Sequence, residues 1–230
     1  MIATSSYKPK TQDTFSLKEV WKTINPNSCP YSYNFHMHTV YSDGKLTPSD
    51  LIQQAIAIGL KGLTITDHHS VGGFLQAQQY LDTVRQENQG SNLPYLWTGV
   101  EITAKLIGVE VHILGYGFDP EHPSLAEYLQ GNSPEGENAA AKRVIDCIHQ
   151  AGGLVVLAHP ARYRHSANKL IPLAVDCGID GVEAYYAYGN PLPWKPSSKQ
   201  TAEILQLAAK YNLYTTCGTD SHGLNLLQRI

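Results

Sequence analysis

Short apolar runs alternate with longer segments of helical periodicity along most of the chain. Five of the apolar runs have the length and composition of buried strands: residues 62–66, 93–100, 154–158, 179–185 and 213–217. Between them, apolar residues recur at the spacing of an amphipathic helix over residues 76–87, 139–151, 169–177 and 199–211. This alternation predicts an α/β fold, with a mostly parallel sheet covered by helices.

One further helix is predicted from its end signals as well as from its periodicity. Thr47 can cap it, Pro48 suits the first helical position, and Asp50 complements the helix dipole. Gly59 supplies the stop. The strand over 62–66 follows at once, so this stretch is read as part of a βαβ unit.

Two segments fall outside the alternating pattern. We expect residues 1–31 to form an N-terminal extension, with a short helix over 16–24 and a loop over 25–30, before a main domain of residues 32–230. Residues 118–138 are rich in Gly, Pro, Asn and Ser. They are predicted to form a short loop-rich insertion, which is a candidate lid.

Polar residues stand where the apolar runs end. Asp67 and His68 follow the first run, Glu101 the second, His159 the third and Asp220 the last. An open nucleotide-binding sheet would carry a G-x-G-x-x-G turn after its first strand, and none occurs there. In a closed β/α barrel the carboxyl ends of all strands converge on one face, where active sites lie. The pattern therefore favours a closed barrel.

Metal-ligand side chains gather at these strand ends. His36 and His38 lie two residues apart in an extended segment, so both imidazoles point to the same side. A lone histidine beside an apolar strand is usually structural, but that does not account for so many at one end of successive strands. Histidines mixed with carboxylates suit Zn²⁺, Mn²⁺ or Fe²⁺ in a catalytic site. The candidate ligands are His36, His38, Asp43, His68, Glu101, His112, His159, Asp220 and His222.

Composition and charge exclude several other classes of protein. The formal charge of −3 provides no basic patch for duplex nucleic acid. No stretch approaches the roughly 18 apolar residues of a membrane span. The four cysteines are scattered without a C-x-x-C pair, which indicates thiols in a reducing compartment rather than disulfides or a zinc knuckle. We therefore expect a cytoplasmic protein that binds neither duplex DNA nor a membrane.

The ordered motifs resemble the PHP superfamily, named for polymerases and histidinol phosphatases, from about residue 33 to residue 223. They are His36-x-His38-Thr39 with Ser42-Asp43-Gly44, Thr66-Asp67-His68, Gly99-Val100-Glu101-Ile102, the run 111–116, Ala158-His159-Pro160 and Gly218-Thr219-Asp220-Ser221-His222. The resemblance implies a distorted seven-stranded (β/α)7 TIM-like barrel with two or three divalent ions. Its ligand sets would be His36, His38, Glu101 and Asp220; Glu101 (bridging), His112 and His159; and Asp43, His68 and His222.

The resemblance implies a metal-dependent phosphoesterase in which a metal-bound hydroxide attacks a small phosphate ester. The chain is most similar to the stand-alone branch acting on nucleoside 3′,5′-bisphosphates and short oligonucleotides. It departs from that branch at His69, where Asp is frequent, and in a shorter segment between His112 and His159. The runner-up function is a histidinol-phosphate phosphatase. A non-catalytic metal-binding PHP module and an amidohydrolase are the alternatives of other classes, although none of the assigned strands ends in the lysine that the latter uses.

Four further residues are candidates for catalysis or substrate binding. Arg162, on the loop after His159, could fork onto a phosphate, and Tyr163 beside it is a second candidate contact. His69 is a candidate for contacting or protonating the leaving group, and Asp67 for orienting a ligand histidine. The aromatic stretch 185–195 suits either stacking on a nucleobase or packing between loops.

Overall fold

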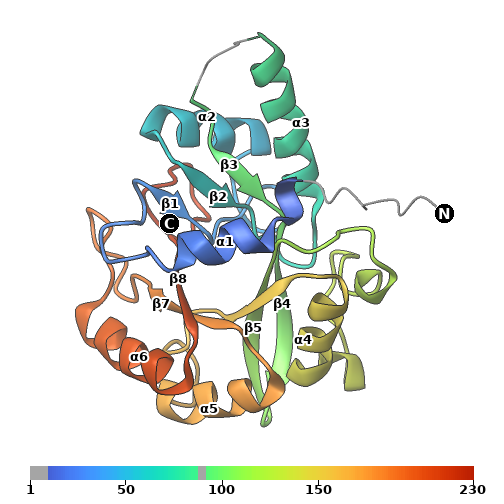
Figure 1. Ribbon diagram of the computed structural model, residues 1–230, viewed down its shortest axis with the longest axis vertical. Helices are drawn as coiled ribbons and strands as arrows, with labels where there is room; N and C mark the ends of the chain where they lie inside the picture. The colour runs from blue at the N-terminus through green and yellow to red at the C-terminus, as the bar shows by residue number, and fades with distance from the viewer. Residues whose placement is uncertain (1–9, 88–91) are drawn as a thin grey trace, which may run out of the picture.

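The computed structural model describes residues 10–87 and 92–230, which form two sheets with helices on their outer sides (Figure 1). The smaller sheet is parallel, in the order β1 (Tyr33–Asn34), β2 (Gly62–Thr64) and β3 (Tyr95–Trp97). The larger sheet runs in sequence order through β4 (Gly99–Leu106), β5 (Val109–Tyr116), β6 (Leu154–Leu157), β7 (Gly181–Tyr185) and β8 (Tyr214–Cys217). The α/β class predicted from the alternating pattern is confirmed.

The predicted closed, seven-stranded barrel is wrong, because the eight strands of the described residues form two separate sheets that are not closed into a barrel. β1 and β2 are only two and three residues long, so the chain leaves regular pairing before it reaches the polar residues. Isolated bridges, Met37 with Ser221 and His68 with Glu101, span the gaps between the sheets. Each bridge joins a single residue near one sheet to a single residue of, or near, the other. The two sheets are therefore held together without a continuous ladder of backbone hydrogen bonds.

The region around Glu101 differs most from the expected pattern. The single strand predicted over 93–100 is two strands in different sheets, β3 and β4, and Glu101 lies inside β4 rather than after it. β4 pairs antiparallel with β5, and β5 antiparallel with β6. β4 and β5 are thus joined by a hairpin rather than by a βαβ crossover. The hairpin turns at Ile107 and Gly108, and both residues have the positive φ of a tight turn.

The helices match the predicted ones closely. α2 (Pro48–Ile58) begins where Thr47 Oγ1 accepts a hydrogen bond from the Asp50 N–H, and ends at Gly59 with φ of 82°. The others are α1 (Thr14–Trp21), α3 (Gly72–Glu87), α4 (Ala141–Gln150), α5 (Ala167–Cys177) and α6 (Ser198–Tyr211), with short 3₁₀ turns at Lys10–Gln12, Pro123–Leu125 and Gly136–Ala139. None of the described helices is long and apolar enough to cross a membrane.

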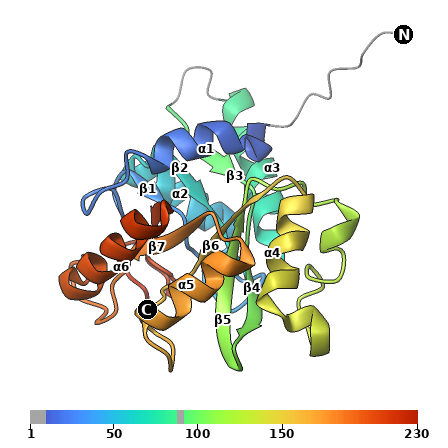
Figure 2. The same ribbon diagram turned by 60° about the horizontal axis from the view of Figure 1, so that its bottom comes forward.

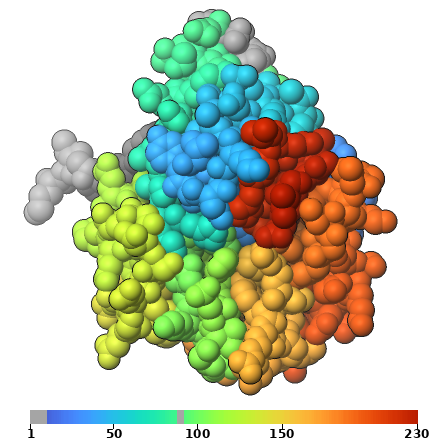
Figure 3. All heavy atoms as spheres, turned by 180° about the vertical axis from the view of Figure 1, so that it is seen from behind, coloured from blue at the N-terminus to red at the C-terminus, as the bar shows by residue number. Residues whose placement is uncertain are grey.

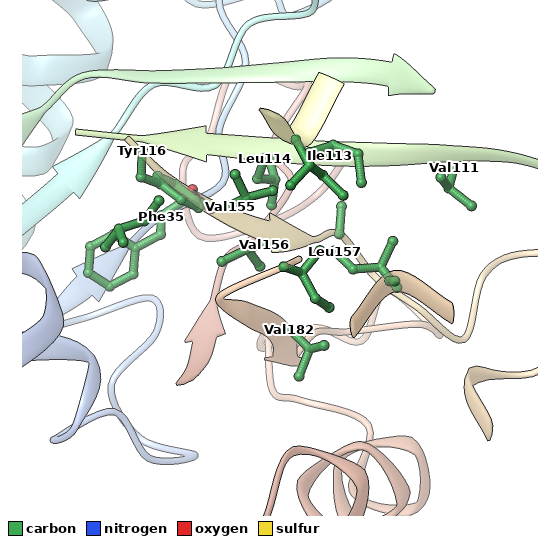
Figure 4. Close-up of a cluster of buried hydrophobic side chains, with 14 of the residues drawn as sticks. Phe35, Val111, Ile113, Leu114, Tyr116, Val155, Val156, Leu157 and Val182 are labelled. Carbon is green, nitrogen blue, oxygen red and sulfur yellow. Dashed lines mark hydrogen bonds between the residues drawn. The ribbon is translucent and has the colours of Figure 1, made fainter. Parts of the chain in front are cut away.

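Two apolar cores hold these layers together. The larger core lies between β4–β8 and helices α4, α5 and α6, which cover the outer face of that sheet (Figure 2). Figure 4 shows Phe35 and Tyr116 side by side in it, next to Val155 of β6. The smaller core lies between β2 and helices α2 and α3, and includes Leu226 from the C-terminal segment.

The N-terminal segment packs on the larger core. α1 begins at an Asp13 cap and buries Leu17 and Trp21, and the Trp21 ring meets Tyr116 edge-on at 5.4 Å. The boundary near residue 31 stays a prediction.

The C-terminal segment folds back beside α2. Gln54 donates a hydrogen bond to the Leu224 carbonyl and accepts one from the Leu226 N–H. Figure 3 shows this red segment against the blue segment around residues 40–60. The His222 N–H donates to the Arg229 carbonyl, which returns the chain toward the histidine motifs.

Candidate metal centre

The structure brings the predicted ligand residues together from six segments of the chain. Glu101 and His112 lie inside β4 and β5, and the others lie in loops that follow strands. They form three overlapping groups, and within each group the ligand atoms lie within 4.8 Å of one another. The inner group is His36, His38, Glu101 and Asp220; the outer group is His38, Asp43, His68 and His222; and the third group is His68, Glu101 and His112. His159 lies beside the third group, with its Nε2 3.4 Å from Glu101 Oε1.

The inner group is buried and tightly spaced. Glu101 Oε2 lies 3.0 Å from His36 Nε2 and 3.1 Å from His38 Nε2. Asp220 Oδ1 lies 3.3 Å and 3.2 Å from the same two nitrogens. Two imidazoles and two carboxylates therefore converge on one point. The His-x-His spacing predicted the orientation of the two imidazoles, and the family resemblance implied the two carboxylates.

Several nitrogens of the centre lack hydrogen-bond partners. Among the described residues, none makes a hydrogen bond to either ring nitrogen of His38 or of His159, although all four nitrogens are buried. The short contacts of His38 with Glu101 and Asp220 are not aligned as hydrogen bonds. Buried polar atoms without partners cost free energy, and a divalent ion would accept these lone pairs. The donor set thus fits a metal that prefers nitrogen and carboxylate ligands.

Electrostatics in the inner group favours charged carboxylates. Burial opposes ionisation of Glu101, but His36 and His112 beside it lower its pKa well below the ordinary value. Burial likewise opposes ionisation of Asp220, but His36 and His38 lower its pKa well below the usual range. Burial alone would lower the pKa of His38, yet its contacts with Asp220 and Glu101 raise it to about 9. Because the pKa of His38 is raised, a metal ion that binds here would have to displace a proton.

The outer group lies at the surface. The Asp43 side chain is 55% exposed, and its Oδ2 lies 3.2 Å from His222 Nε2 and 3.9 Å from His68 Nε2. Burial lowers the pKa of His68 to about 4, so its ring is neutral at pH 7 and its lone pair is free for a ligand. Glu101 spans the groups, because its Oε1 lies 2.8 Å from His112 Nδ1 while Oε2 faces the inner group.

Glu183 supports the centre, although no role was assigned to it from the sequence. It is fully buried on β7, its Oε1 lies 3.0 Å from His36 Nδ1, and its Oε2 accepts the His159 N–H. It therefore orients one ligand-type side chain and the backbone of another. An acidic residue in the middle of an apolar strand was the sequence signal for it.

A cationic cluster surrounds the second oxygen of Asp220. Oδ2 accepts hydrogen bonds from Tyr186 at 2.6 Å, Arg162 at 3.0 Å and Arg229 at 2.9 Å. The Arg162 and Arg229 side chains are 36% and 25% exposed, so both border solvent next to the inner group. Arg162 was predicted from the sequence as a phosphate contact. Arg229 was not predicted, because it follows the last motif and fits no periodic pattern.

Asp67 and Tyr163, two further candidates from the sequence, form hydrogen bonds within the protein. Asp67 is fully buried and accepts hydrogen bonds from Thr39 and Ser42 rather than from a histidine, so it fixes the turn that carries Asp43. The Tyr163 hydroxyl donates to the Ala158 carbonyl and accepts the His112 N–H, and thereby joins two elements of the centre.

His69 faces a cavity of about 610 Å³. Its Nε2 lies 3.1 Å from Thr103 Oγ1 and 3.2 Å from Ser133 Oγ. Asp43, His68 and His112 line the same cavity, which therefore opens directly onto the metal centre. A larger cavity of 660 Å³ lies at the opposite ends of β2 and β3, beside Lys61 and Tyr95, away from these ligands.

Backbone strain also gathers at the centre. His69, His159 and Asp220 have φ of 52°, 25° and 54°, in the left-handed region that few residues other than glycine adopt. Strained backbone of this kind persists where surrounding contacts enforce it, and clusters at functional sites.

A protein-family model described as the PHP domain matches residues 34–219, which is most of the chain and includes seven of the nine ligand candidates. The chain belongs to the PHP family of metal-dependent phosphoesterases. The family and the enzyme class expected from the motifs are thereby confirmed.

Curated relatives of this chain include exoribonucleases and a nucleoside bisphosphate phosphatase. A 5′-3′ exoribonuclease of Haemophilus influenzae is 33% identical over 144 residues, 57% of this chain and 49% of the relative. The 5′-3′ exoribonuclease Rnm of Escherichia coli is 24% identical over 262 residues, 83% of this chain and 85% of the relative. A 3′,5′-nucleoside bisphosphate phosphatase of Chromobacterium violaceum is 34% identical over 119 residues, 52% of this chain and 39% of the relative. The chain thus spans about half of the Haemophilus relative.

Two solved structures share the fold. A candidate metal-dependent phosphoesterase from Bifidobacterium adolescentis has a TM-score of 0.68 at 24% identity. An amidohydrolase from Chromobacterium violaceum, with bound sulfate and no metal, also has a TM-score of 0.68, at 22% identity. Both matches cover 84% of this chain and 88% of the other. These likenesses concern the fold alone.

Proposed function

We propose that this PHP enzyme hydrolyses a phosphate ester of a small nucleotide, either a nucleoside 3′,5′-bisphosphate or a short oligonucleotide. The observation that carries the proposal is the convergence of three overlapping groups of histidines and carboxylates beside one open cavity of 610 Å³. The substrate class is drawn from the relatives, which are an exoribonuclease and a nucleoside bisphosphate phosphatase.

The charge of the centre suits a phosphate. Three carboxylates, Asp43, Glu101 and Asp220, lie in the groups that would hold the metals. They offset half the charge of three divalent ions and leave about +3 in the site, which favours an anion with several oxygens. With two ions, the balance is closer to about +1 and still attracts an anion.

We assign the nine candidate ligands to two or three divalent ions, of manganese, zinc or iron. Such ions, when bound, polarise a phosphoryl group and lower the pKa of water from 15.7 toward about 7. Glu101 is the shared ligand, since its two oxygens face different groups. Glu183 keeps His36 in the orientation that presents Nε2 to the centre.

The protein's own donors border the place where a phosphate would bind. Arg162 binds Asp220 and Tyr186 through Nη1, and its Nε and Nη2 make no hydrogen bond to the part of the chain that the structure describes. Arg229 is held by its Nε. Both guanidinium groups thus keep donors for phosphate oxygens, and we propose that they bind the substrate.

His69 is proposed as a second substrate contact. It lines the cavity, and Thr103 and Ser133 orient its Nε2. Tyr163 and Asp67 are better suited to support, because their polar atoms are already bonded within the protein. Hydrolysis is proposed to be direct and in line, and trapping of a phosphorylated enzyme would contradict this step.

The test follows hydrolysis of three substrates by Mn²⁺-loaded protein in parallel. Release of inorganic phosphate is measured with adenosine 3′,5′-bisphosphate and histidinol phosphate, and release of inorganic phosphate or mononucleotides with a 5′-phosphorylated oligoribonucleotide. Asp220→Asn serves as the blank, because it changes one ligand with little change of volume. We expect turnover of at least one nucleotide substrate and background release by the variant. Turnover of histidinol phosphate alone would contradict the proposed substrate class and favour the runner-up function.

A further inference from the structure

The cavity next to the metal centre has an aromatic wall, which is Tyr41. Its side chain is 44% exposed and lines the cavity together with Asp43, His68 and His69. An exposed aromatic ring beside a charged centre is well placed to meet an apolar part of the substrate. The metal ligands do not need this ring, and the mechanism proposed above does not use it.

The ring of Tyr41 is held in a rigid turn. The Tyr41 N–H donates to Thr39 Oγ1, whose own hydroxyl donates to Asp67. On one side the ring lies directly against the backbone at Gly72, where an added Cβ would come within 2.3 Å of Tyr41 Cδ1. Gly72 is the first residue of α3, so the ring rests on a fixed element. A preorganised aromatic surface costs little conformational entropy when a ligand stacks on it.

The aromatic stretch 185–195, which the sequence offered as an alternative stacking surface, has a different role. Tyr185, Tyr186 and Trp194 are 6%, 1% and 5% exposed. Tyr186 donates its hydroxyl to Asp220, and Tyr185 and Trp194 belong to the larger core. These three rings pack inside the protein, and none of them lines the cavity at the metal centre.

Polar groups complete the cavity around Tyr41. The tip of the loop-rich segment 118–138 supplies Gly131, Asn132 and Ser133 to the lining, and the Gly131 N–H donates to the His69 carbonyl. The cavity therefore combines an aromatic surface, amide and hydroxyl groups, and the ligands of the metal centre. A nucleoside phosphate has the matching parts: a planar base, a polar sugar and a phosphate.

We propose that Tyr41 forms a nucleobase subsite, in which the base of the substrate stacks on its exposed ring while the scissile phosphate lies at the metal centre. This proposal rests on the proposed function and narrows its substrate class to esters that carry a planar aromatic base. Base–aromatic stacking tolerates any base, so the subsite binds nucleotides without strict sequence selection.

The first test compares two substrates that differ only in the base. Tyr41→Ala and Tyr41→Phe are assayed with adenosine 3′,5′-bisphosphate and with the corresponding ribose bisphosphate that lacks the base. We expect Tyr41→Ala to raise KM for the adenosine compound about 10-fold, and Tyr41→Phe to stay close to wild type. The KM of Tyr41→Ala for the base-free compound should change by less than about twofold, because no stacking is lost.

Each outcome of this test has a distinct meaning. If the wild type hydrolyses adenosine 3′,5′-bisphosphate and Tyr41→Ala leaves its KM unchanged, the subsite proposal is wrong. An equal rise of KM for both substrates would show that Tyr41 only stabilises its turn. This result would also contradict the proposal. If the wild type hydrolyses no nucleotide, the proposed function fails, and the binding measurement below decides the subsite separately.

The second test measures binding before turnover. The three native tryptophans are buried, so Tyr41→Trp would add an exposed indole at the cavity. We expect adenosine 3′,5′-bisphosphate to quench its fluorescence when rapidly mixed with Mn²⁺-loaded protein, before turnover, and the base-free bisphosphate to leave it unchanged. The wild-type tryptophans should respond to neither. Equal quenching by both compounds, or by neither, would overturn the subsite.

Discussion

The metal centre has a buried interior and an exposed rim, and the two are built differently. In the interior, the side chains of His36, Glu101 and Asp220 are at most 2% exposed, and each is held by partners from other elements. On the rim, Asp43 is 55% exposed and Tyr41 44% exposed. In the interior, Glu101 lies on β4 and the other ligands lie just after β1 and β8, whereas Tyr41 and Asp43 of the rim lie on an exposed turn.

We infer that the interior ligands act mainly on the reaction and that the rim side chains act mainly on substrate binding. Buried charges act in a medium of low polarity, so each interior ligand has a large effect on the metal and on the reaction. Rim side chains stay in contact with water, and their effects are smaller and fall mainly on binding. Substitutions in the two regions should therefore differ in size and in the kinetic constant that they change.

The largest effect is expected at the shared ligand. Glu101→Gln should lower kcat/KM about 1,000-fold and reduce the bound metal, because the amide cannot replace a carboxylate between two groups. Glu110→Gln is the matched control, since Glu110 is exposed on the neighbouring strand. Metal content by mass spectrometry and phosphate release measure the two effects. Full metal content and normal activity in Glu101→Gln would contradict the assigned ligand set.

A smaller loss is expected at the supporting carboxylate of the interior. Glu183→Gln should weaken metal affinity by about 10- to 100-fold, because it removes the charged partner of His36 Nδ1. Glu121→Gln, in an exposed loop, is the control. Metal titration distinguishes this role from a packing role, and excess Mn²⁺ should restore activity. A loss of stability with unchanged metal affinity would show that Glu183 acts only in packing.

The rim ligand should show an intermediate effect. Asp43→Asn removes the exposed carboxylate of the outer group and should lower kcat/KM about 10-fold while the interior keeps its metal. Asp176→Asn, an exposed carboxylate on α5, is the control. A metal count that falls by one ion in Asp43→Asn would support a separate outer site. Loss of all metal would contradict the division into interior and rim.

The smallest effect is expected at the second arginine. Arg229→Gln should raise KM about fivefold, since it removes one partly exposed guanidinium from the border of the centre. Arg164→Gln, on the loop beside Arg162, is the control and should match wild type, because Arg164 is exposed. A change in kcat with constant KM would show that Arg229 positions Asp220 and does not bind the substrate.

Local patterns in the sequence predicted much of this fold. The caps of α2 depend on Thr47 and Gly59, and both are observed in those roles. The two-residue spacing of His36 and His38 placed both imidazoles on one side, where they meet Glu101. These features depend on neighbours within a few residues, which a periodic pattern can encode.

Features that depend on distant contacts were missed. The hairpin between β4 and β5 has the same apolar composition as strands in a parallel sheet, so the pattern did not reveal its antiparallel pairing. The barrel did not close because β1 and β2 end after two or three residues. Arg229 reaches Asp220 only through the backbone turn that begins at His222, which no local signal indicates.

The measurement that tests the account most directly is phosphate release from adenosine 3′,5′-bisphosphate by metal-loaded protein, with metal content determined on the same samples. Wild type, Glu101→Gln and Tyr41→Ala are compared at the same metal concentration. The account predicts turnover by wild type, its loss together with metal in Glu101→Gln, and turnover by Tyr41→Ala with a raised KM and full metal content. No turnover by fully metal-loaded wild type, or equal turnover by all three proteins, would contradict it.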